Sequence, residues 1–196
     1  MTQLEQINSS RRAFTSLAMT LGLTASICPL SALMLPESAL AAAPVPLRLF
    51  NPHTKEQYDV EIFSKGKWNK MGILACDWMM RDWRENKTVQ CDRKLYAALY
   101  VIQQHFGIKE PISINSGFRS IKTNTMLRNA SIKTYGRATT KTPALDSQHI
   151  QAKAMDFAIP GVSPKKVSNY VKTLKMGGTG HYSTFTHMDT GTIRSW

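Results

Sequence analysis

The sequence of 196 residues has little cysteine, few acidic residues and no long apolar run. Its three cysteines cannot supply a structural zinc site closed by four cysteines. The 25 lysines and arginines outnumber the 13 aspartates and glutamates, and this net charge of +12 favours an anionic partner. The apolar run from Leu17 to Ile27 is interrupted by polar residues and is shorter than the about 20 residues of a membrane span. No internal repeat or second domain is visible.

Residues 1–43 have the features of a targeting segment. Ser10-Arg11-Arg12-Ala13-Phe14 matches the twin-arginine export signal, and Ala39-Leu40-Ala41 offers a cleavage site behind the apolar run. An uncleaved membrane anchor is the alternative. We therefore predict a signal peptide over residues 1–43 and a folded domain over 44–196. The mature protein is expected in the periplasm, exported by the twin-arginine route and not stably inserted in the membrane.

The predicted mature domain keeps the positive charge of the whole chain. Residues 1–43 contain two arginines and two glutamates, so residues 44–196 retain 23 basic and 11 acidic residues and a net charge of +12. Outside the cytoplasm the nearest polyanions are cell-wall carboxylates and the outer face of the membrane. No basic helix with interleaved aromatic residues stands out, so we expect no nucleic-acid partner.

Two cysteines, Cys76 and Cys91, remain after the predicted cleavage. An exported chain enters a compartment that permits disulfides. A Cys76–Cys91 bridge would close a loop of roughly 15 residues and contribute about 3 kcal/mol if unstrained. Two buried thiols are the alternative.

Two histidines and a carboxylate form the candidate functional centre. His149 and Asp156 are seven positions apart, and His187 follows near the C-terminus. Two nitrogen donors and one oxygen donor are the ligand set of a catalytic zinc, which keeps a fourth position for water. The alternative is three residues that never meet.

Hydrophobic periodicity indicates a small single α+β domain. A β-hairpin is predicted over 47–62, helices over 71–83, 93–106, 122–128 and 164–176, and strands over 112–114, 154–158 and 185–189. In the first helix, Leu74, Trp78 and Trp83 are expected in the core. We expect an antiparallel sheet that carries the metal site, with helices packed on one side. The polar loop over 131–148 is expected to form a wall of the cleft.

The wider pattern around the candidate ligands resembles a known family. Ser147-x-His149-x-x-x-x-Ala154-x-Asp156 is preceded by Ser116-Gly117-Phe118-Arg119-Ser120 and followed by Phe185-Thr186-His187-Met188-Asp189-Thr190-Gly191. The set resembles the zinc D-alanyl-D-alanine peptidases, and most closely their YcbK-like branch of exported murein endopeptidases. The resemblance covers residues 47–196. It includes Asn51-Pro52-His53-Thr54 and Arg81-Asp82-Trp83-Arg84, which have no obvious chemistry of their own.

The resemblance implies a chemistry for named residues. Zn²⁺ would be bound by His149, Asp156 and His187 and would act on D-amino-acid-containing peptide cross-links of peptidoglycan. Arg119 is implied to face the substrate beside the metal, where its guanidinium could meet a developing oxyanion or a carboxylate. Ser147 is implied to hydrogen-bond the substrate.

The general base is less clearly marked. Many relatives have an acidic residue three positions before the second histidine ligand, where this chain has Thr184. Asp189 shares the strand face of His187, so it is either the catalytic base or a carboxylate that orients a histidine ligand. His181 is a further candidate proton carrier. Ala152 also departs from the family, because relatives usually have glycine there.

The leading hypothesis is therefore an exported, monomeric zinc peptidase that hydrolyses peptidoglycan cross-links. A D,D-carboxypeptidase or dipeptidase that releases terminal D-alanine is the second reading. A non-catalytic wall-binding protein with a structural metal is the third, and Thr184 is its main support.

Overall fold

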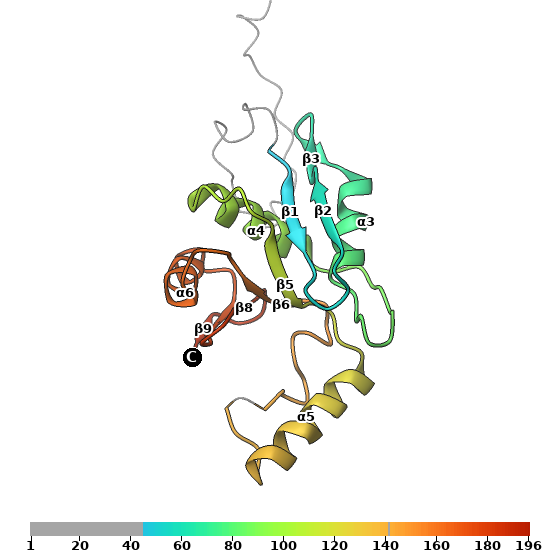
Figure 1. Ribbon diagram of the computed structural model, residues 1–196, viewed down its shortest axis with the longest axis vertical. Helices are drawn as coiled ribbons and strands as arrows, with labels where there is room; N and C mark the ends of the chain where they lie inside the picture. The colour runs from blue at the N-terminus through green and yellow to red at the C-terminus, as the bar shows by residue number, and fades with distance from the viewer. Residues whose placement is uncertain (1–44, 141) are drawn as a thin grey trace, which may run out of the picture. The chain divides into compact units, whose positions relative to one another are not determined.

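The computed structural model describes residues 45–140 and 142–196 (Figure 1). The predicted signal peptide, residues 1–43, lies outside the described residues. The described part contains a seven-stranded sheet of order β2-β1-β5-β6-β8-β7-β9 and a separate pair, β3-β4. The strands are β1 (Leu47–Phe50), β2 (Gln57–Val60), β3 (Phe63–Ser64), β4 (Lys67–Trp68), β5 (Ile112–Ser116), β6 (Ala154–Ala158), β7 (Gly178–His181), β8 (Thr186–Asp189) and β9 (Arg194–Ser195).

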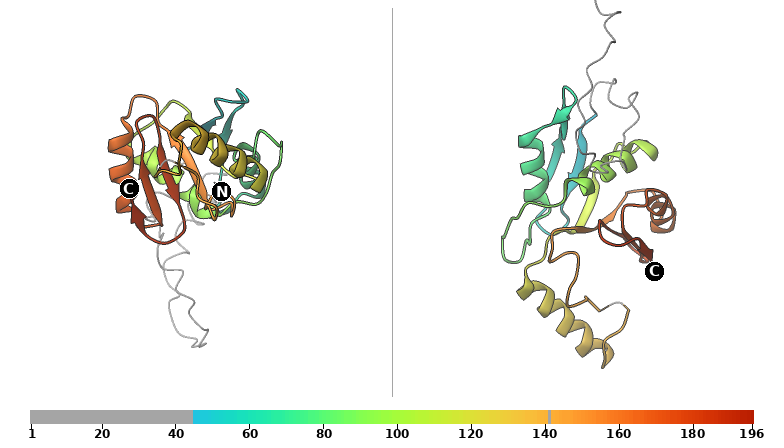
Figure 2. Two further views of the ribbon diagram at one scale, coloured as in Figure 1. Left: turned by 90° about the horizontal axis from the view of Figure 1, so that it is seen from below. Right: turned by 180° about the vertical axis from the view of Figure 1, so that it is seen from behind.

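Four helices accompany the sheet in the described part of the chain. They are α3 (Lys70–Met79), α4 (Arg93–His105), α5 (Ile121–Tyr135) and α6 (Pro164–Thr173). Helix α3 packs beside β2, α4 beside β1, and α6 against β7 and β8. Helix α5 instead extends beyond the end of the sheet (Figures 1 and 2). The α+β class is confirmed, with a single sheet at its centre.

The sheet is mixed rather than wholly antiparallel. The central pairs β5–β6, β6–β8 and β8–β7 are antiparallel, as expected. Strands β1 and β5 are parallel, because α3 and α4 lie between them in the chain and return it to the same end of the sheet. Strands β7 and β9 are parallel because β8 reverses the chain between them. Both parallel pairs lie outside the strands that carry the candidate ligands.

Helix α4 has the buried face that its periodicity predicts. Leu95, Leu99 and Ile102 are fully buried in the core. The Asp92 side chain accepts a hydrogen bond from a first-turn amide and so caps the helix. Gly107 follows the helix with φ 59, a left-handed conformation that favours glycine.

Helix α3 buries a different face from the one predicted. Trp78 and Leu74 are exposed, and the buried positions are Gly72, Ile73, Cys76, Asp77 and Met79. Trp78 donates a hydrogen bond from Nε1 to Glu56 at 3.1 Å, and the Arg81 guanidinium lies 4.0 Å from its ring centre. The large aromatic side chain thus covers the edge of the domain instead of filling its core.

Cys76 and Cys91 are free, buried thiols in this structure, which is the alternative to the predicted disulfide. Burial raises the pKa of both thiols, to about 12 for Cys91. The buried carboxylate of Asp77 joins the two segments: its Oδ1 accepts hydrogen bonds from the Cys91 amide at 2.9 Å and the Tyr96 hydroxyl at 2.6 Å.

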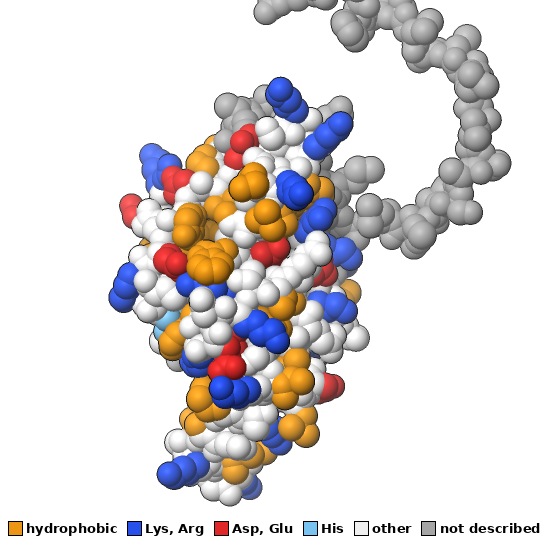
Figure 3. Space-filling model, turned by 90° about the vertical axis from the view of Figure 1, so that its right-hand side faces the viewer, with side chains coloured by type: hydrophobic (Ala, Val, Ile, Leu, Met, Phe, Trp, Pro, Cys, Tyr) orange, Lys and Arg blue, Asp and Glu red, His pale blue; other side chains and the backbone are white. Residues whose placement is uncertain are grey.

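The surface of the described domain is mixed in charge. On the face in Figure 3, lysine and arginine side chains are spread among acidic and apolar ones and form no single patch. Among the described residues, no helix has the length and apolar character needed to cross a membrane.

Candidate metal centre

The pairing of β6 with β8 sets two of the predicted ligands opposite each other. Asp156 and His187 are direct partners in the antiparallel register, so their side chains extend from the same face of the sheet. Met155 and Phe157, on either side of Asp156, are fully buried in the core. The alternation of a strand turns Asp156 away from them and into the candidate centre.

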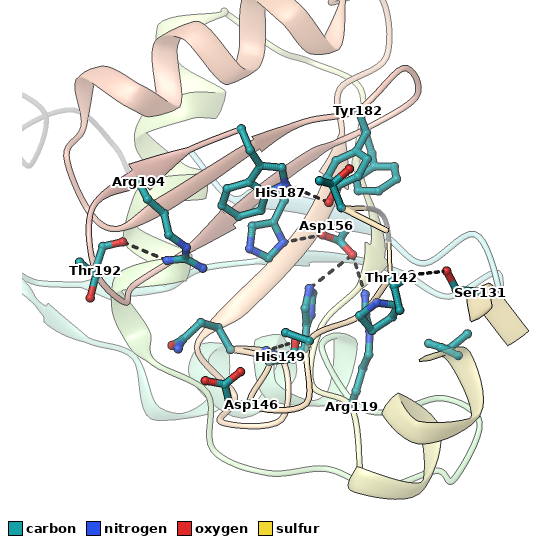
Figure 4. Close-up of a pocket in the computed structure, with 18 residues that line it drawn as sticks. Arg119, Ser131, Thr142, Asp146, His149, Asp156, Tyr182, His187, Thr192 and Arg194 are labelled. Carbon is teal, nitrogen blue, oxygen red and sulfur yellow. Dashed lines mark hydrogen bonds and ion pairs between the residues drawn. The ribbon is translucent and has the colours of Figure 1, made fainter. Parts of the chain in front are cut away.

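His149 joins this pair from the loop before β6, and its ring is fixed from behind (Figure 4). Its Nδ1 lies 2.7 Å from the Gly117 carbonyl oxygen. Because a carbonyl can only accept, Nδ1 carries the proton and Nε2 keeps its lone pair. Burial lowers the pKa of His149, which favours this neutral form. Nε2 is buried without a hydrogen-bond partner and lies 3.4 Å from Asp156 Oδ2.

Asp156 and His187 are coupled to each other. His187 Nδ1 donates to Asp156 Oδ1 at 2.8 Å. Burial alone would raise the pKa of Asp156, but His149, His187 and Arg119 outweigh it and hold the pKa well below its usual value. Burial alone would lower the pKa of His187, but Asp156 and Asp189 outweigh it and raise the pKa. An ionised carboxylate therefore faces both histidine rings.

The three residues fit a metal ion. One donor atom from each of His149, Asp156 and His187 lies within 4.8 Å of the other two, and all three side chains are buried. The unpartnered Nε2 of His149 is a donor that a cation would satisfy, since buried polar atoms are otherwise paired. A metal would also replace the proton shared by His187 and Asp156.

Asp189 lies behind His187. Its Oδ2 accepts from His187 Nε2 at 3.1 Å, on the other side of the ring from Asp156. The Asp189 side chain is 0% exposed and does not line the cleft. Burial alone would raise its pKa, but hydrogen bonds from His187, two backbone amides and Arg194 hold the pKa far below its usual value. This position suits an orienting carboxylate better than a catalytic base.

Arg119 reaches the candidate ligands from the turn after β5. Its Nη2 donates to Asp156 Oδ2 at 2.8 Å and its Nε to Ser116 Oγ at 2.9 Å. Its backbone amide donates to the His149 carbonyl at 3.1 Å. Ser147 lines the cleft as well, and its hydroxyl accepts from the His149 amide at 3.3 Å. The structure thus brings both predicted substrate-facing residues next to the candidate ligands.

The Arg81–Arg84 segment, which showed no chemistry in the sequence, supports the turn that carries Arg119. Asp82 is buried, and its Oδ2 accepts from the Ser120 amide at 2.9 Å. The Phe118 amide donates to the Met80 carbonyl at 2.7 Å. The segment therefore fixes the turn from both ends and, through the Gly117 carbonyl, the ring of His149.

The Asn51–Thr54 segment packs on the same support. His53 stacks on Trp83 with ring centres 4.5 Å apart, and its Nε2 lies 3.0 Å from the Asn115 carbonyl oxygen. Glu56 pairs with Arg81 at 2.8 Å. Both segments are thus structural neighbours of β5 rather than parts of the cleft.

The candidate ligands lie at the base of a cleft of about 790 Å³ (Figure 4). One wall, here named the sheet wall, consists of β6 to β9 with Tyr182, Phe185, Arg194 and Trp196. The other, here named the α5 arm, consists of residues 121–140 and 142–148. The arm contributes the lining residues Leu127, Ser131, Thr140, Thr142, Pro143, Ala144, Asp146, Ser147 and Gln148. The predicted role of the polar loop as a cleft wall is confirmed, although α5 extends further than expected, to Tyr135.

Several cleft residues could not be identified from the sequence. Asp146 is one of many polar residues in its loop, so no local pattern distinguishes it. Tyr182, Arg194 and Trp196 belong to short edge segments without periodicity. In the reverse sense, the candidate proton carrier His181 is exposed and does not line the cleft. Thr184 is also exposed and outside the lining.

Ala152 has a left-handed backbone with φ 56. For a residue with a Cβ this conformation costs about 1–2 kcal/mol, a cost that glycine would avoid. The turn is held by the Ala152 amide, which donates to the His149 carbonyl at 3.2 Å, and by the Ala152 carbonyl, which accepts from the Asp92 amide at 3.0 Å. The extra methyl is accommodated without loss of the site.

Comparisons with known proteins agree with this geometry. The model of the family described as peptidoglycan L,D-endopeptidase MepK matches residues 39–196. Peptidoglycan L,D-endopeptidase MepK of Escherichia coli (strain K12) is 34% identical over 173 residues, which cover 85% of this chain and 90% of the relative. The probable peptidoglycan L,D-endopeptidase MepK of Haemophilus influenzae is 34% identical over 170 residues, 83% of this chain and 87% of the relative. No solved structure matches significantly.

Proposed function

Because the chain belongs to the peptidoglycan L,D-endopeptidase MepK family of M15 metallopeptidases, we propose that it hydrolyses an L,D peptide bond in peptidoglycan, with zinc at the His149–Asp156–His187 site. The observation that carries the proposal is the unpartnered, buried Nε2 of His149, directed at Asp156 at the base of an open cleft. A purely structural polar cluster would have that nitrogen satisfied.

The donors favour zinc in a catalytic role. His149 Nε2, an Asp156 carboxylate oxygen and His187 Nδ1 would hold the ion, and three protein ligands leave a position open toward the cleft. When bound there, zinc lowers the pKa of water to about 7 and polarises a carbonyl oxygen. Gly117 and Asp189 each hold the second ring nitrogen of one histidine, which fixes the orientation of both rings.

Arg119 is proposed to stabilise negative charge on the substrate. Its guanidinium has five N–H donors, and Asp156 and Ser116 each take one in the structure. Donors therefore remain for the oxygen that becomes negative when the amide carbonyl is attacked. Ser147, on the same cleft lining, is proposed to hydrogen-bond the substrate backbone.

Asp146 is proposed as the general base. Hydrolysis adds the hydroxyl of water to the carbonyl carbon and breaks the C–N bond, while a proton passes from water to the leaving nitrogen. Asp146 and Asp156 are the two carboxylates that line the cleft, and Asp156 is engaged by His187 and Arg119. In the described part of the chain no hydrogen bond or ion pair holds Asp146, so its carboxylate is free to carry the proton.

Defined muropeptides test the proposed activity. The zinc-loaded protein should convert dimers with an L,D cross-link to monomers and leave D,D-linked dimers intact. Release of free D-alanine from monomers would support the D,D-carboxypeptidase reading instead. Binding of muropeptides by fully zinc-loaded protein without any product would support the wall-binding reading.

The export proposal concerns residues 1–43. We propose that the twin-arginine signal delivers the protein to the periplasm, where its substrate lies. Replacing Arg11 and Arg12 by lysine should retain the protein in the cytoplasm, because this signal is read by a receptor. Undiminished export of the double variant in cell fractionation would indicate another route.

The proposed catalyst is a monomer, since a single chain supplies the candidate ligands and both walls of the cleft. Light scattering of the zinc-loaded protein should give the mass of one chain at concentrations where it is active.

A further inference from the structure

We propose that Arg194 is a positioning residue of the metal centre, which holds Asp189 and through it the His187 ring in the orientation that binds the metal. The inference rests on the proposed metal site. Arg194 touches neither the candidate ligands nor the reacting atoms and would act through Asp189. The short edge strand β9 would thereby contribute to the metal centre.

Asp189 is a buried carboxylate that needs a countercharge. This carboxylate is 0% exposed, and a charge in such a place is stable only when it is paired and fully hydrogen-bonded. The amides of Gly178 and Gly191 donate to Oδ1 at 2.8 and 2.9 Å, and His187 donates to Oδ2 at 3.1 Å. A neutral ring provides no countercharge, so Arg194 is the cation that balances Asp189 when His187 binds a metal.

Arg194 and Asp189 form a pair with a defined geometry. Nη2 donates to Oδ2 at 2.7 Å and Nη1 to Oδ1 at 3.2 Å, a two-pronged contact that fixes the plane of the carboxylate. Nη1 also donates to the Thr192 carbonyl at 3.0 Å. Arg194 borders the cleft, but three of its five N–H donors are taken by Asp189 and Thr192, which holds its guanidinium against the Asp189 carboxylate.

Strand β7 leaves space for this pair through its glycines. A Cβ on Gly178 would lie 2.4 Å from Asp189 Oδ2 and 2.6 Å from Arg194 Nη1. Gly178 is also the register partner of Arg194 in the parallel β7–β9 pairing. Further along β7, a Cβ on Gly180 would lie 2.8 Å from the Trp196 ring, which packs 5.2 Å from His187. The two glycines of β7 thus leave room for the side chains of Arg194 and Trp196, and Trp196 packs beside His187.

The resulting chain of contacts is continuous. Arg119 contacts Asp156, and Asp156 contacts His187 (Figure 4). His187 in turn contacts Asp189, and Asp189 contacts Arg194. Each carboxylate lies between an arginine and the same imidazole. Arg119 holds the carboxylate at Nδ1 of His187, and Arg194 holds the carboxylate at Nε2.

The test measures metal binding without substrate. Arg194→Gln should weaken zinc affinity by about 10–100-fold in a chelator competition, the usual effect of losing a partner behind a metal ligand. The visible absorption of the Co²⁺-substituted protein should also shift, because the His187 ring changes orientation. Arg194→Lys keeps the positive charge but cannot make the two-pronged contact with Asp189. Its zinc affinity should therefore lie between that of the wild type and that of Arg194→Gln. Arg48→Gln removes another arginine–aspartate pair, at the far end of the sheet, and should change neither measurement.

Wild-type zinc affinity and an unchanged Co²⁺ spectrum in Arg194→Gln would overturn the inference. Circular dichroism checks that the variant folds, as expected for a side chain that is 43% exposed. If it does not fold, Gly178→Ala and Arg194→Lys decide the question, since both should weaken zinc binding and shift the spectrum. Failure of the proposed hydrolase is a separate result: it would appear as zinc-loaded wild type without muropeptide products, whatever Arg194 does.

Discussion

The two walls of the cleft differ in how they are held. In the sheet wall, all four residues of β8 are buried, and strands on both sides pair with it. In the α5 arm, helix α5 has two buried residues, Thr123 and Asn124. Hydrogen bonds join this helix to the rest of the arm, from Asn124 to Ala144, from Arg128 to Pro143 and between Ser131 and Thr142.

The difference matches two demands on a peptidase. A metal centre tolerates displacements of only about 0.5 Å, so its ligands need rigid, buried surroundings. Segments with few buried contacts open at low free-energy cost and can adapt to a large polymeric substrate. We therefore expect the sheet wall to determine metal affinity, and the α5 arm to determine substrate affinity and to supply the proton carrier.

The largest effect is expected for His149, the candidate ligand contributed by the loop before β6. His149→Ala removes the unpartnered Nε2, so zinc should be lost in equilibrium dialysis and no turnover should be detectable. His181→Ala, a histidine outside the cleft lining, should keep both properties. Retention of stoichiometric zinc by His149→Ala would mean that the metal binds elsewhere.

A large effect is next expected in the α5 arm. Asp146→Asn should lower kcat by about 10²–10⁴-fold, the usual range for loss of acid–base catalysis, with unchanged zinc affinity. Asp59→Asn on the exposed edge strand β2 serves as the matched control. Normal turnover by Asp146→Asn would show that the α5 arm does not supply the general base and contributes to substrate binding alone.

A smaller effect is expected for the carboxylate behind His187. Asp189→Asn should weaken zinc affinity by about 10–100-fold, and excess zinc should restore turnover, because the amide is nearly isosteric but accepts a weaker hydrogen bond. The measurement is kcat against zinc concentration. A low kcat that persists at saturating zinc would instead make Asp189 the catalytic base.

The smallest effect is expected for a hydrogen bond within the α5 arm. Asn124→Ala removes the bond to the Ala144 carbonyl and should destabilise the arm locally by about 1 kcal/mol. Amide exchange over 121–148 should accelerate about fivefold and KM should rise, while zinc affinity stays constant. An equal acceleration of amide exchange across β6 and β8 would show that the two walls open together and do not differ in rigidity.

Local sequence patterns were sufficient to predict the rigid part of the molecule. The alternation around Asp156 located β6 at 154–158, and the capping signals at Asp92 and Ser163 located the starts of α4 and α6. The three candidate ligands were identified by spacing and resemblance, and the structure brings them together.

The remaining features depend on contacts between distant segments. Arg194 is recognisable as a neighbour of Asp189 only once β9 pairs with β7, and a two-residue strand has no periodicity to detect. Asp189 shares a strand face with His187, but the sequence could not tell which side of the ring it would occupy. On α3, both faces carry apolar residues, so periodicity alone could not decide that Trp78 would be exposed.

The alkylation rate of the two buried thiols would report how often the core opens. Only the thiolate reacts with alkylating reagents, and both groups are buried with a raised pKa, so modification has to wait for a transient opening of the segments that carry Cys76 and Cys91. Neither cysteine lines the cleft. The labelling rate with and without zinc would therefore report whether zinc binding beside the central strands β6 and β8 slows the transient opening of the α3–α4 side, a coupling that activity measurements cannot detect.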